Sequence, residues 1–482
     1  MIAIRKLAAI AVFPAILGGC VSSAEYAKKE AGFATVSAKT RSVTAKEAVW
    51  IQNQQQAKSL SAQVKALLSR KKTLDVETAV QIALFNNKGL QAAYADLGDG
   101  AADAWQTTML LNPTVSVGLK GIGTAELEAF RTIEGAITTN ILALITKKRD
   151  VELADTRFRQ AQLNAAIQTL RLATETRHAW INTVAAYESV DQLQRAQTAA
   201  DAASELAEKL GETGAMAKGA QAREHAFVAE LAAETAKARL AARLAKEELT
   251  RFMGLWGSDM DYQIPNSLPT LPKTIAQRDT IEADALRNRV DLRVAKLELE
   301  ASAHSYGLTE ATRHVTDLEL LTGAEAERSR EDGRKKTELT GSTEIGFAIP
   351  IFDSGKARMR KAELAYMRAA NKLAERAVNV RSEARSSYQA YRSSLDIARH
   401  YRNNVVPLRT KVEEQSLLTY NGMITNTFEL LTDTREKINS ILLSVNAKRD
   451  FWLAEANLAP AIYGGGSSSA PADIASASGS DE

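Results

Sequence analysis

Between Lys147 and Leu210 the chain contains neither glycine nor proline. One continuous helix over this stretch would be roughly 96 Å long at a rise of 1.5 Å per residue, which is more than a compact globular domain can accommodate. A second stretch without either residue, 356–406, ends at Pro407, where we expect a kink or an interruption. Aromatic residues make up only 6% of the chain, and Ala, Leu, Glu, Lys, Arg and Gln dominate its middle, as is typical of long helices. We therefore predict a mainly α fold with a small β part, built on long antiparallel helical hairpins.

The sequence also contains an internal two-fold repeat. Shifting 83–101 by 202 positions superimposes it on 285–303. The shared residues are Ala83, Leu84, Asn86, Leu90, Ala93, Leu97 and Ala101, which fall on Ala285, Leu286, Asn288, Leu292, Ala295, Leu299 and Ala303. Their spacing, mostly three or four residues, predicts one stripe along a helix. In each half this helix is followed by two alternating segments and a long helix, so we expect two halves of one architecture.

The predicted organisation follows from these halves. We expect a signal peptide over 1–19, an N-terminal segment over 20–72, a first repeat over 73–253, a linker over 254–280, a second repeat over 281–460 and a disordered Gly/Ser/Ala-rich tail over 461–482. Further helices are predicted over 45–70, 76–110 with interruptions at Gly98 and Gly100, 220–253, 281–312 and 424–459.

Alternating polar and apolar residues predict two β-hairpins. In the first half, residues 114–119 alternate, and odd positions from Ile133 to Ile145 are largely apolar. In the second half, 315–322 is a weaker candidate, 325–336 is predicted to be a charged loop, and 343–351 is the clearest strand. Such alternation also fits a soluble sheet with one buried face. The position of each hairpin between long helices favours a membrane pore instead.

Four strands of this length cannot close a barrel in one chain, and open sheet edges in lipid leave backbone groups without hydrogen bonds. Other copies of the chain must therefore complete the sheet, and three copies would give a 12-stranded β-barrel, an even number within the range of membrane barrels. Its lumen would be lined by the polar alternates Thr114, Ser116, Glu344 and Gly346, and the apolar alternates would face lipid. The alternative is a lipid-anchored periplasmic coiled-coil scaffold without channel activity.

The N-terminus has the features of a secretion signal. Arg5 and Lys6 precede an apolar run that is too short to span a bilayer, and Leu17-Gly18-Gly19-Cys20 resembles a bacterial lipobox. This implies cleavage before Cys20 and a lipid anchor, including palmitate, on the chain's single cysteine. Val21 follows where an Asp would imply retention in the inner membrane, which points to the outer membrane. The alternative is an ordinary secretory signal with an incidental cysteine.

Several motifs, taken in order, resemble the TolC-type outer membrane efflux factors, in their lipoprotein-anchored branch. The motifs are Thr73-Leu74-Asp75 with Ala83-Leu84-Phe85-Asn86-Asn87, Leu111-Asn112-Pro113, Met253-Gly254 followed by Leu268-Pro269-Thr270-Leu271-Pro272, and Ile349-Pro350-Ile351-Phe352-Asp353-Ser354-Gly355-Lys356. The resemblance implies a homotrimer, with a 12-stranded outer membrane β-barrel that continues into a helical periplasmic tunnel. It implies a passive exit duct of a tripartite system that exports drugs or metal ions. A periplasmic adaptor would open it and an inner membrane pump would supply energy. An exit duct for type I protein secretion is the other option within the family.

The resemblance also implies functional residues at the periplasmic tips of the helical hairpins, where the tunnel would close and the adaptor would dock. The candidates are Gly211, Gly214, Tyr420, Gly422, Glu429 and Asp433. Glu429 and Asp433 are alternative positions for an acidic residue of the aperture, and the family's Tyr with a Gly three residues later is here Tyr420-Asn421-Gly422.

Nothing in the sequence points to catalysis. The five His residues have no metal-binding spacing such as His-Glu-x-x-His, and Gly355-Lys356 lacks the upstream glycine of a phosphate-binding loop. The formal net charge of +3 comes without a dense basic patch, so we expect no nucleic acid partner. We predict no enzyme, no metal site and no cofactor.

Overall fold

The computed structural model describes residues 23–70, 72–122, 131–214, 216–331, 334–422, 424 and 427–466. The predicted signal peptide, Cys20 and most of the predicted tail lie outside these residues. The chain forms two compact units. Of the described residues, one unit contains 23–32, Asp96–Gln162 and Val294–Glu375, and the other contains Phe33–Ala95, Leu163–Arg293 and 376–466. Each unit thus combines parts of both halves of the sequence.

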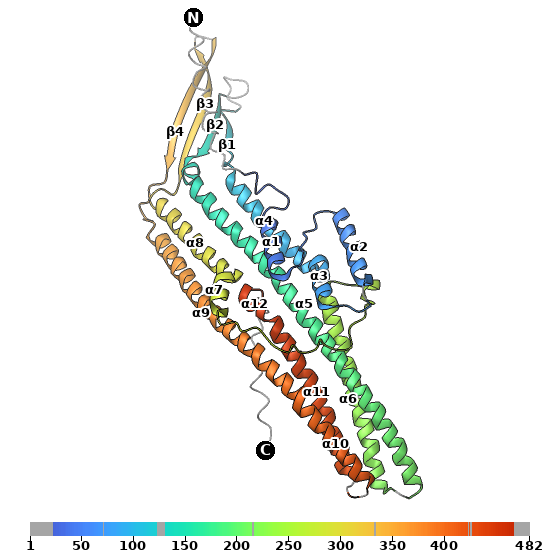
Figure 1. The fold of residues 1–482 in the computed structure, drawn as a ribbon. Coiled ribbons are helices and arrows are strands. Elements are labelled where there is room, and N and C mark those ends of the chain that lie inside the picture. The colour runs from blue at the N-terminus through green and yellow to red at the C-terminus, as the bar shows by residue number, and fades with distance from the viewer. Residues whose placement is uncertain are drawn as a thin grey trace. The chain divides into compact units, whose positions relative to one another are not determined.

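The same order of elements occurs twice along the chain (Figure 1). After α1 (Phe33–Thr44) and α2 (Gln54–Arg70), the first half contains α3 (Val76–Asn86), α4 (Lys88–Thr108), β1 (Thr114–Lys120), β2 (Thr132–Asn140), α5 (Ile141–Glu212) and α6 (Lys218–Met253). A short 3-10 turn (Gly257–Met260) lies in the linker. The second half contains α7 (Ile281–Asn288), α8 (Val290–Ala311), β3 (Leu318–Glu331), β4 (Arg334–Phe347), α9 (Lys356–His400), a π-helical turn (Tyr401–Val405), α10 (Val406–Asn421), α11 (Thr427–Ala456) and α12 (Leu458–Tyr463).

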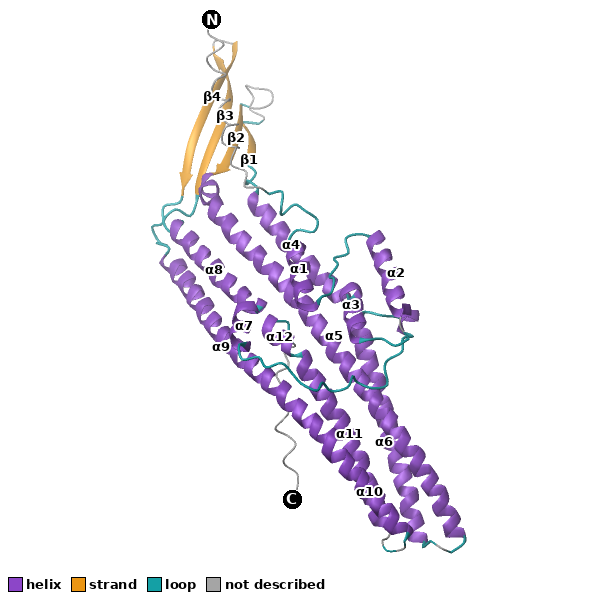
Figure 2. Ribbon diagram, in the orientation of Figure 1, coloured by secondary structure: helices purple, strands orange, loops and turns teal. Residues whose placement is uncertain are grey.

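The four strands form one antiparallel sheet in the order β1-β2-β3-β4 (Figure 2). Strand β2 passes directly into α5, the longest helix at 72 residues. The side chain of Asn140 accepts a hydrogen bond from the backbone N–H of Ala143 at 2.8 Å and so caps the first turn of this helix. Among the described strands, β1 and β4 each have a single neighbour, so both outer edges of the sheet are open.

The first helix of each half is broken at equivalent residues. Asn87 separates α3 from α4, and Arg289 separates α7 from α8. Both residues have an extended backbone conformation, and the backbone N–H of each still donates to the carbonyl four residues earlier. The predicted interruptions at Gly98 and Gly100 are wrong, because α4 continues through both. A Cβ at Gly100 would lie 3.2 Å from Ala161 Cβ, so this glycine allows α4 and α5 to approach closely.

Three further element predictions are wrong. The charged segment 325–336 is not a loop, because β3 and β4 continue through it up to Glu331 and from Arg334. Ile141 and Ile145 belong to α5 rather than to a strand. The helix predicted over 45–70 begins only at Gln54, since α1 ends before Ala45, whose left-handed backbone (φ 55°) cannot continue a helix.

The interior of the second unit lies between its helices. Leu193 of α5, Phe227 and Leu231 of α6 and Leu431 of α11 form one buried cluster, which joins the α5–α6 hairpin to the α10–α11 hairpin. In a second cluster, Leu271 of the linker packs against α9 and α11. The linker therefore contributes to the core of this unit and packs across α9 and α11.

Candidate functional sites in the sheet and at the helix tips

The four residues predicted to line a lumen lie on one face of the sheet. Residues that pair directly across an antiparallel sheet share a face. Thr114 pairs with Thr138, Thr138 with Leu321, and Leu321 with Glu344, so this row joins the two predicted hairpins. Ser116 and Gly346 lie two residues from Thr114 and Glu344, respectively, and therefore on the same face. This face also carries Glu134, Glu319, Glu325, Glu327 and Glu338, together with Lys120 and Lys336.

The opposite face is apolar over the length of β1 and β2. It carries Val115, Val117, Leu119, Ile133, Ile137, Leu318, Leu320, Leu339, Ile345 and Phe347, with Thr, Gly and Ala between them. Val117 is 73% exposed and Leu339 is 76% exposed in the single chain. An apolar face of this size in contact with water is unfavourable, so lipid or another protein must cover it.

At the tip of the second hairpin, three polar contacts join α10 to α11. Ser416 donates a hydrogen bond to Asp433, Lys437 Nζ lies 3.1 Å from Glu413 Oε2, and Arg409 pairs with Glu436. Asp433, one of the two candidates for an acidic aperture residue, is thus held by the buried Ser416 of its own hairpin. The other candidate, Glu429, lies exposed in the first turn of α11.

An ion pair joins the two hairpins of the second unit near this end. Arg435 Nη2 of α11 lies 2.5 Å from Glu230 Oε2 of α6, and the guanidinium lies 5.1 Å from the centre of the Phe227 ring. The three side chains line a groove of about 550 Å³ between the hairpins, above the cluster formed by Phe227, Leu231 and Leu193. The sequence analysis missed these residues, because Glu230 and Arg435 are 205 positions apart and no local pattern connects them.

The tip glycines differ in their structural roles. Gly214, in the turn between α5 and α6, has a φ of +75°, which L side chains rarely adopt. Gly211 lies in the last turn of α5, and a Cβ there would lie 2.6 Å from Gln221 Oε1. Gly422 has an ordinary φ of −79°, with Tyr420 two residues before it at the end of α10. Only the first hairpin therefore depends on glycine geometry at its turn.

A carboxylate is buried within the first hairpin near its tip. Glu224 of α6 is 5% exposed and lies on the same side of the helix as the buried Phe227 and Leu231. Burial raises the pKa of Glu224, and the nearby His225 lowers it by a smaller amount. His225 Nδ1 lies 2.7 Å from Ser204 Oγ of α5. This part of the α5–α6 contact is thus polar, unlike the apolar cluster farther along.

The N-terminal segment is fixed to α5 within the first unit. Tyr26 Oη donates a hydrogen bond to Asp155 at 2.8 Å, and its ring packs edge-on against Phe158, with ring centroids 5.4 Å apart. Burial and the hydrogen bond to Asp155 raise the pKa of Tyr26 to about 12. Gly32 then passes so close to Phe158 that a Cβ would lie 2.8 Å from its ring. Cys20 lies six residues before Tyr26, outside the described residues.

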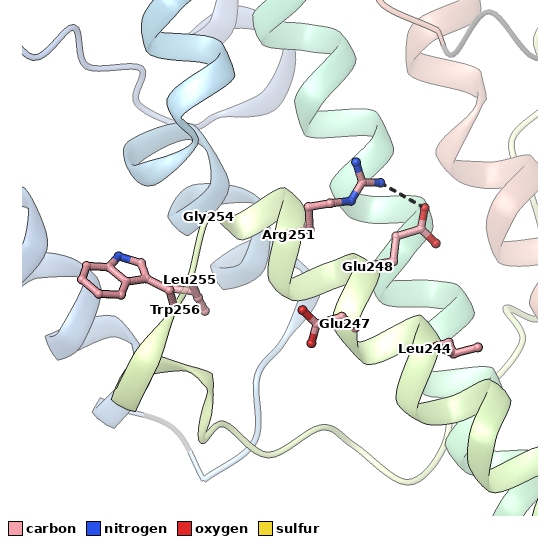
Figure 3. Close-up of a pocket in the computed structure, with 7 residues that line it drawn as sticks. All are labelled: Leu244, Glu247, Glu248, Arg251, Gly254, Leu255 and Trp256. Atoms are coloured by element: carbon pink, nitrogen blue, oxygen red, sulfur yellow. Dashed lines mark ion pairs between the residues drawn. The ribbon is translucent and has the colours of Figure 1, made fainter.

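One shallow pocket lies at the C-terminal end of α6 (Figure 3). It has a volume of about 590 Å³ and is lined by Leu244, Glu247, Glu248, Arg251, Gly254, Leu255 and Trp256. Glu248 and Arg251 form an ion pair at 3.6 Å, and Trp256 is 81% exposed and extends away from the other lining residues in Figure 3. The lining thus combines the apolar side chains of Leu244, Leu255 and Trp256 with three charged side chains of α6.

Two features are absent from the described part of the chain. No group of three or more His, Cys, Asp or Glu residues in this part of the chain lies close enough to bind a metal ion. No helix among the described residues is both long and apolar enough to cross a bilayer.

Comparison with known proteins identifies the fold. No protein-family model and no curated protein matches the sequence. Among solved structures, the chain is similar to the CmeC outer membrane channel of Campylobacter jejuni, with a TM-score of 0.66, 16% identity and coverage of 81% of this chain and 86% of CmeC. It is similar to the outer membrane protein VceC of Vibrio cholerae, with a TM-score of 0.65, 16% identity and coverage of 84% and 97%. It is also similar to the open state of the MtrE outer membrane channel of Neisseria gonorrhoeae, with a TM-score of 0.63, 16% identity and coverage of 81% and 89%. The predicted TolC-type channel fold is thereby confirmed.

Proposed function

We propose that this chain is a subunit of a passive exit duct through the bacterial outer membrane, not an enzyme. The observation that carries the proposal is the single four-stranded sheet, which has one polar face, one apolar face and two open edges. The similarity in fold to CmeC, VceC and MtrE supports it. In a bilayer, the apolar face would contact lipid, and Thr114, Ser116, Glu344 and Gly346 would face a water-filled lumen.

The open edges explain why the proposed duct needs several copies of the chain. In lipid, each unpaired backbone N–H or C=O costs several kcal/mol, so the edge of β4 must pair with the edge of β1 in a neighbouring copy. Because the two edges differ, this contact is heterologous, and a ring forms if the rotation from one copy to the next closes. Three copies give twelve strands, an even number within the range of membrane barrels. The homotrimer is therefore the assembly we propose.

The contacts between the two hairpins suggest how the proposed duct opens. The ion pair between Arg435 and Glu230 and the packing of Arg435 on Phe227 stabilise one arrangement of the α10–α11 and α5–α6 hairpins. We propose that this arrangement is the closed one and that a periplasmic adaptor binds a second arrangement more tightly, which shifts the population towards the open duct. An inner membrane pump would supply the energy and select the cargo, which we take to be drugs or metal ions.

The position of Tyr26 supports lipid anchoring at Cys20. Asp155, its partner, lies 14 residues after the start of α5 at Ile141, or about 21 Å along the helix from the end of β2. The six residues from Cys20 to Tyr26 can span at most about 20 Å. Acyl chains on Cys20 could therefore enter the membrane beside the base of the strands, at its periplasmic surface.

The first experiment measures single-channel conductance of the purified protein in planar bilayers, together with its native oligomeric mass. The proposal predicts a trimer that gives discrete current steps. A monomer or dimer that never conducts would contradict it and would favour the lipid-anchored coiled-coil scaffold.

Neighbouring residues of β4 provide a matched test of the two faces. Glu344 lies on the polar face and Thr343 on the apolar face. We expect Glu344→Lys to leave insertion intact and to shift the reversal potential towards anion selectivity, because three added cations would line the lumen. We expect Thr343→Lys to reduce insertion, because a charge on the lipid face costs about 2–4 kcal/mol near the bilayer midplane. The reverse pattern would mean that the faces are assigned the wrong way round.

A further inference from the structure

The carboxylate of Glu224 is buried in the first hairpin without a partner. This residue is 5% exposed, although it lies in the second turn of α6, close to the turn that joins α5 to α6. In the described part of the chain, no hydrogen bond and no ion pair reaches its side chain. An ionised carboxylate at such a position loses its hydration without compensation, so burial favours the neutral form.

The side of α5 that contacts this part of α6 carries small side chains. Ser204 and Ala207 are both buried and lie three residues apart, on one side of α5. Ser204 Oγ lies 2.7 Å from His225 Nδ1, which identifies this side as the one that contacts α6. The serine hydroxyl is thus engaged with the histidine, and Ala207 has only a methyl group.

The charged residues of the neighbouring elements do not compensate the carboxylate. The exposed ones nearest to it along the two helices of the hairpin are Asp201, Glu205, Glu208, Lys209 and Glu212 of α5, and Lys218, Arg223 and His225 of α6. On α11, which packs against the same side of α6, Glu429 is exposed, and Asp433 and Arg435 have partners of their own. Among the described residues, only the charge of His225 acts on Glu224, and it lowers the pKa of the carboxyl by less than burial raises it.

The start of α6 is weakly held. Ala217 is its N-cap residue and makes no side-chain hydrogen bond, and the first turn contains no acidic residue. Gly219 lies in this turn, with open space on the side where a Cβ would project. A missing cap and a glycine both lower the stability of a helix. The first two turns of α6 can therefore open locally at small cost, and this opening gives Glu224 access to water.

We infer that Glu224 is a pH-sensitive element of the first hairpin: the protonated carboxyl lets the start of α6 close on α5, and the ionised carboxylate favours local opening of these turns. The direction follows from proton linkage. Burial raises the pKa of Glu224 in the closed hairpin, whereas the open form has the usual pKa of about 4.3. Opening therefore releases a proton between these two values, so the open form gains up to about tenfold for each pH unit within this window. Below about pH 4.3 both forms are protonated and the effect ends.

The consequence for transport rests on the proposed function, in which these turns lie at the closing end of the duct. Local opening at the start of α6 would loosen the closed arrangement of the tip, so a rise in periplasmic pH would ease opening of the duct. Acid would have the opposite effect and would hold the first hairpin closed.

Hydrogen exchange of the full-length protein in detergent, between about pH 4.5 and pH 8, measures the local opening. Protection factors of the amides in 218–228 are compared with those in 231–242 of the same helix, which removes the intrinsic pH dependence of exchange. Glu224→Gln and Glu224→Met both keep a neutral side chain at every pH. Glu208→Gln is the matched control, since it removes an exposed carboxylate of the same hairpin.

We expect the protection of 218–228 to fall at least about threefold over this range in the wild type and in Glu208→Gln, and to stay constant in both Glu224 variants. A wild-type protection that does not change with pH would overturn the inference, as would Glu224 variants that follow the wild type. If His225→Gln abolishes the pH dependence and the Glu224 variants keep it, the histidine is the sensor and the inference is wrong.

Conductance of the same proteins separates this inference from the proposed function. If the wild type never conducts, the proposed duct fails, and hydrogen exchange still decides whether Glu224 controls the hairpin. If the wild type conducts, its open probability should rise with pH more steeply than that of Glu224→Gln. An equal pH dependence in the two proteins would overturn the regulatory role of Glu224 and leave the duct standing.

Discussion

Asn87 and Arg289 occupy equivalent positions in the two halves of the chain. Asn87 separates α3 from α4 and is hydrogen-bonded to the end of α6, and Arg289 separates α7 from α8 and is hydrogen-bonded to α12. Asn87 Nδ2 donates to the carbonyl of Phe252 at 3.0 Å, and Arg289 Nη1 donates to the carbonyl of Ala461 at 3.5 Å. The first half thus uses a neutral amide where the second uses a buried guanidinium. Arg289 is 6% exposed, forms two hydrogen bonds to Asp291 at 2.7 and 2.9 Å and also pairs with Glu383.

This difference predicts unequal costs of removing the two side chains. Arg289→Ala leaves the largely buried Asp291 with the backbone N–H of Leu292 and the more distant Arg376, and we expect a loss of about 3–5 kcal/mol in the free energy of unfolding. Asn87→Ala removes two neutral hydrogen bonds, the one to Phe252 and the one that Asn87 Oδ1 accepts from the backbone N–H of Leu90, and should cost about 1–2 kcal/mol. Urea unfolding of the detergent-solubilised protein, followed by circular dichroism, measures both. Equal costs would show that the guanidinium network is no more stabilising than the amide.

The same cluster predicts a loss of stability in acid. Burial raises the pKa of Asp291, but the hydrogen bonds and charge of Arg289, with the charge of Arg376, outweigh it and hold the pKa below its usual value. A carboxyl group with a lowered pKa stabilises the folded state above its unfolded pKa of about 3.9, and this stabilisation is lost as the pH falls below that value. In the wild type, we expect the urea concentration at the unfolding midpoint to decrease as the pH is lowered from about 4 to about 2. In Asp291→Asn the urea midpoint should change less with pH over this range. An unchanged pH dependence would show that Asp291 is not the group responsible.

Breaking the contact between the hairpins should favour the open duct. The Arg435–Glu230 pair is half-exposed, so each copy is worth about 0.5 kcal/mol, and three copies shift the ratio of open to closed channels by about tenfold. We expect Glu230→Ala to raise the open probability in planar bilayers by this amount. Glu413→Ala serves as the control, since it breaks a pair within the α10–α11 hairpin. The charge swap Glu230→Arg with Arg435→Glu should return the open probability to the wild-type value. If the channel with the swapped charges stays open, the ion pair is not what holds the duct closed.

The two tip turns should respond differently to alanine. Gly214→Ala forces an L side chain into a φ of +75° and should cost about 1–2 kcal/mol. Gly422→Ala keeps an ordinary φ, its Cβ would have no heavy atom closer than 3.5 Å, and we expect a change of less than about 0.5 kcal/mol. Thermal unfolding of the trimer measures both. A larger effect at Gly422 would indicate a functional contact at that turn.

The anchoring of the N-terminal segment can be tested in two steps. Cys20→Ala should abolish incorporation of labelled palmitate while the trimer still conducts, and persistent labelling would place the lipid elsewhere. Tyr26→Phe removes the hydrogen bond to Asp155 at a cost of about 1 kcal/mol, so we expect faster proteolysis before Phe33. Tyr187→Phe is a control for the substitution, since Tyr187 lies in the second unit.

The elements that depend on local pattern could be predicted from the sequence. The breaker-free stretch from Lys147 forms a single helix, and the alternation around Val117 forms a strand whose polar and apolar residues lie on opposite faces of the sheet. The predicted loop over 325–336 is wrong, because charged side chains do not by themselves exclude a strand. A strand that extends beyond an apolar band can carry charges on both faces, since its backbone hydrogen bonds come from its partner strand.

The contacts between distant segments could not be predicted. The pairing of Glu230 with Arg435 depends on how two hairpins pack, and the break at Arg289 depends on a buried network that gathers residues from α7, α8, α9 and α12. The repeat does point to Asn87 and Arg289 as equivalent positions, but their different side chains conceal the equivalence in the sequence.

The open edges of the sheet have a consequence for cells that produce two versions of the chain. In the proposed ring every copy supplies one edge to each neighbour, so a single copy with a damaged β1 or β4 would leave the whole ring unclosed. If damaged and intact copies mix equally and at random, only about one ring in eight would contain three intact copies. A damaged allele should therefore be genetically dominant, and the severity of its effect should follow gene dosage rather than the stability of the damaged protein.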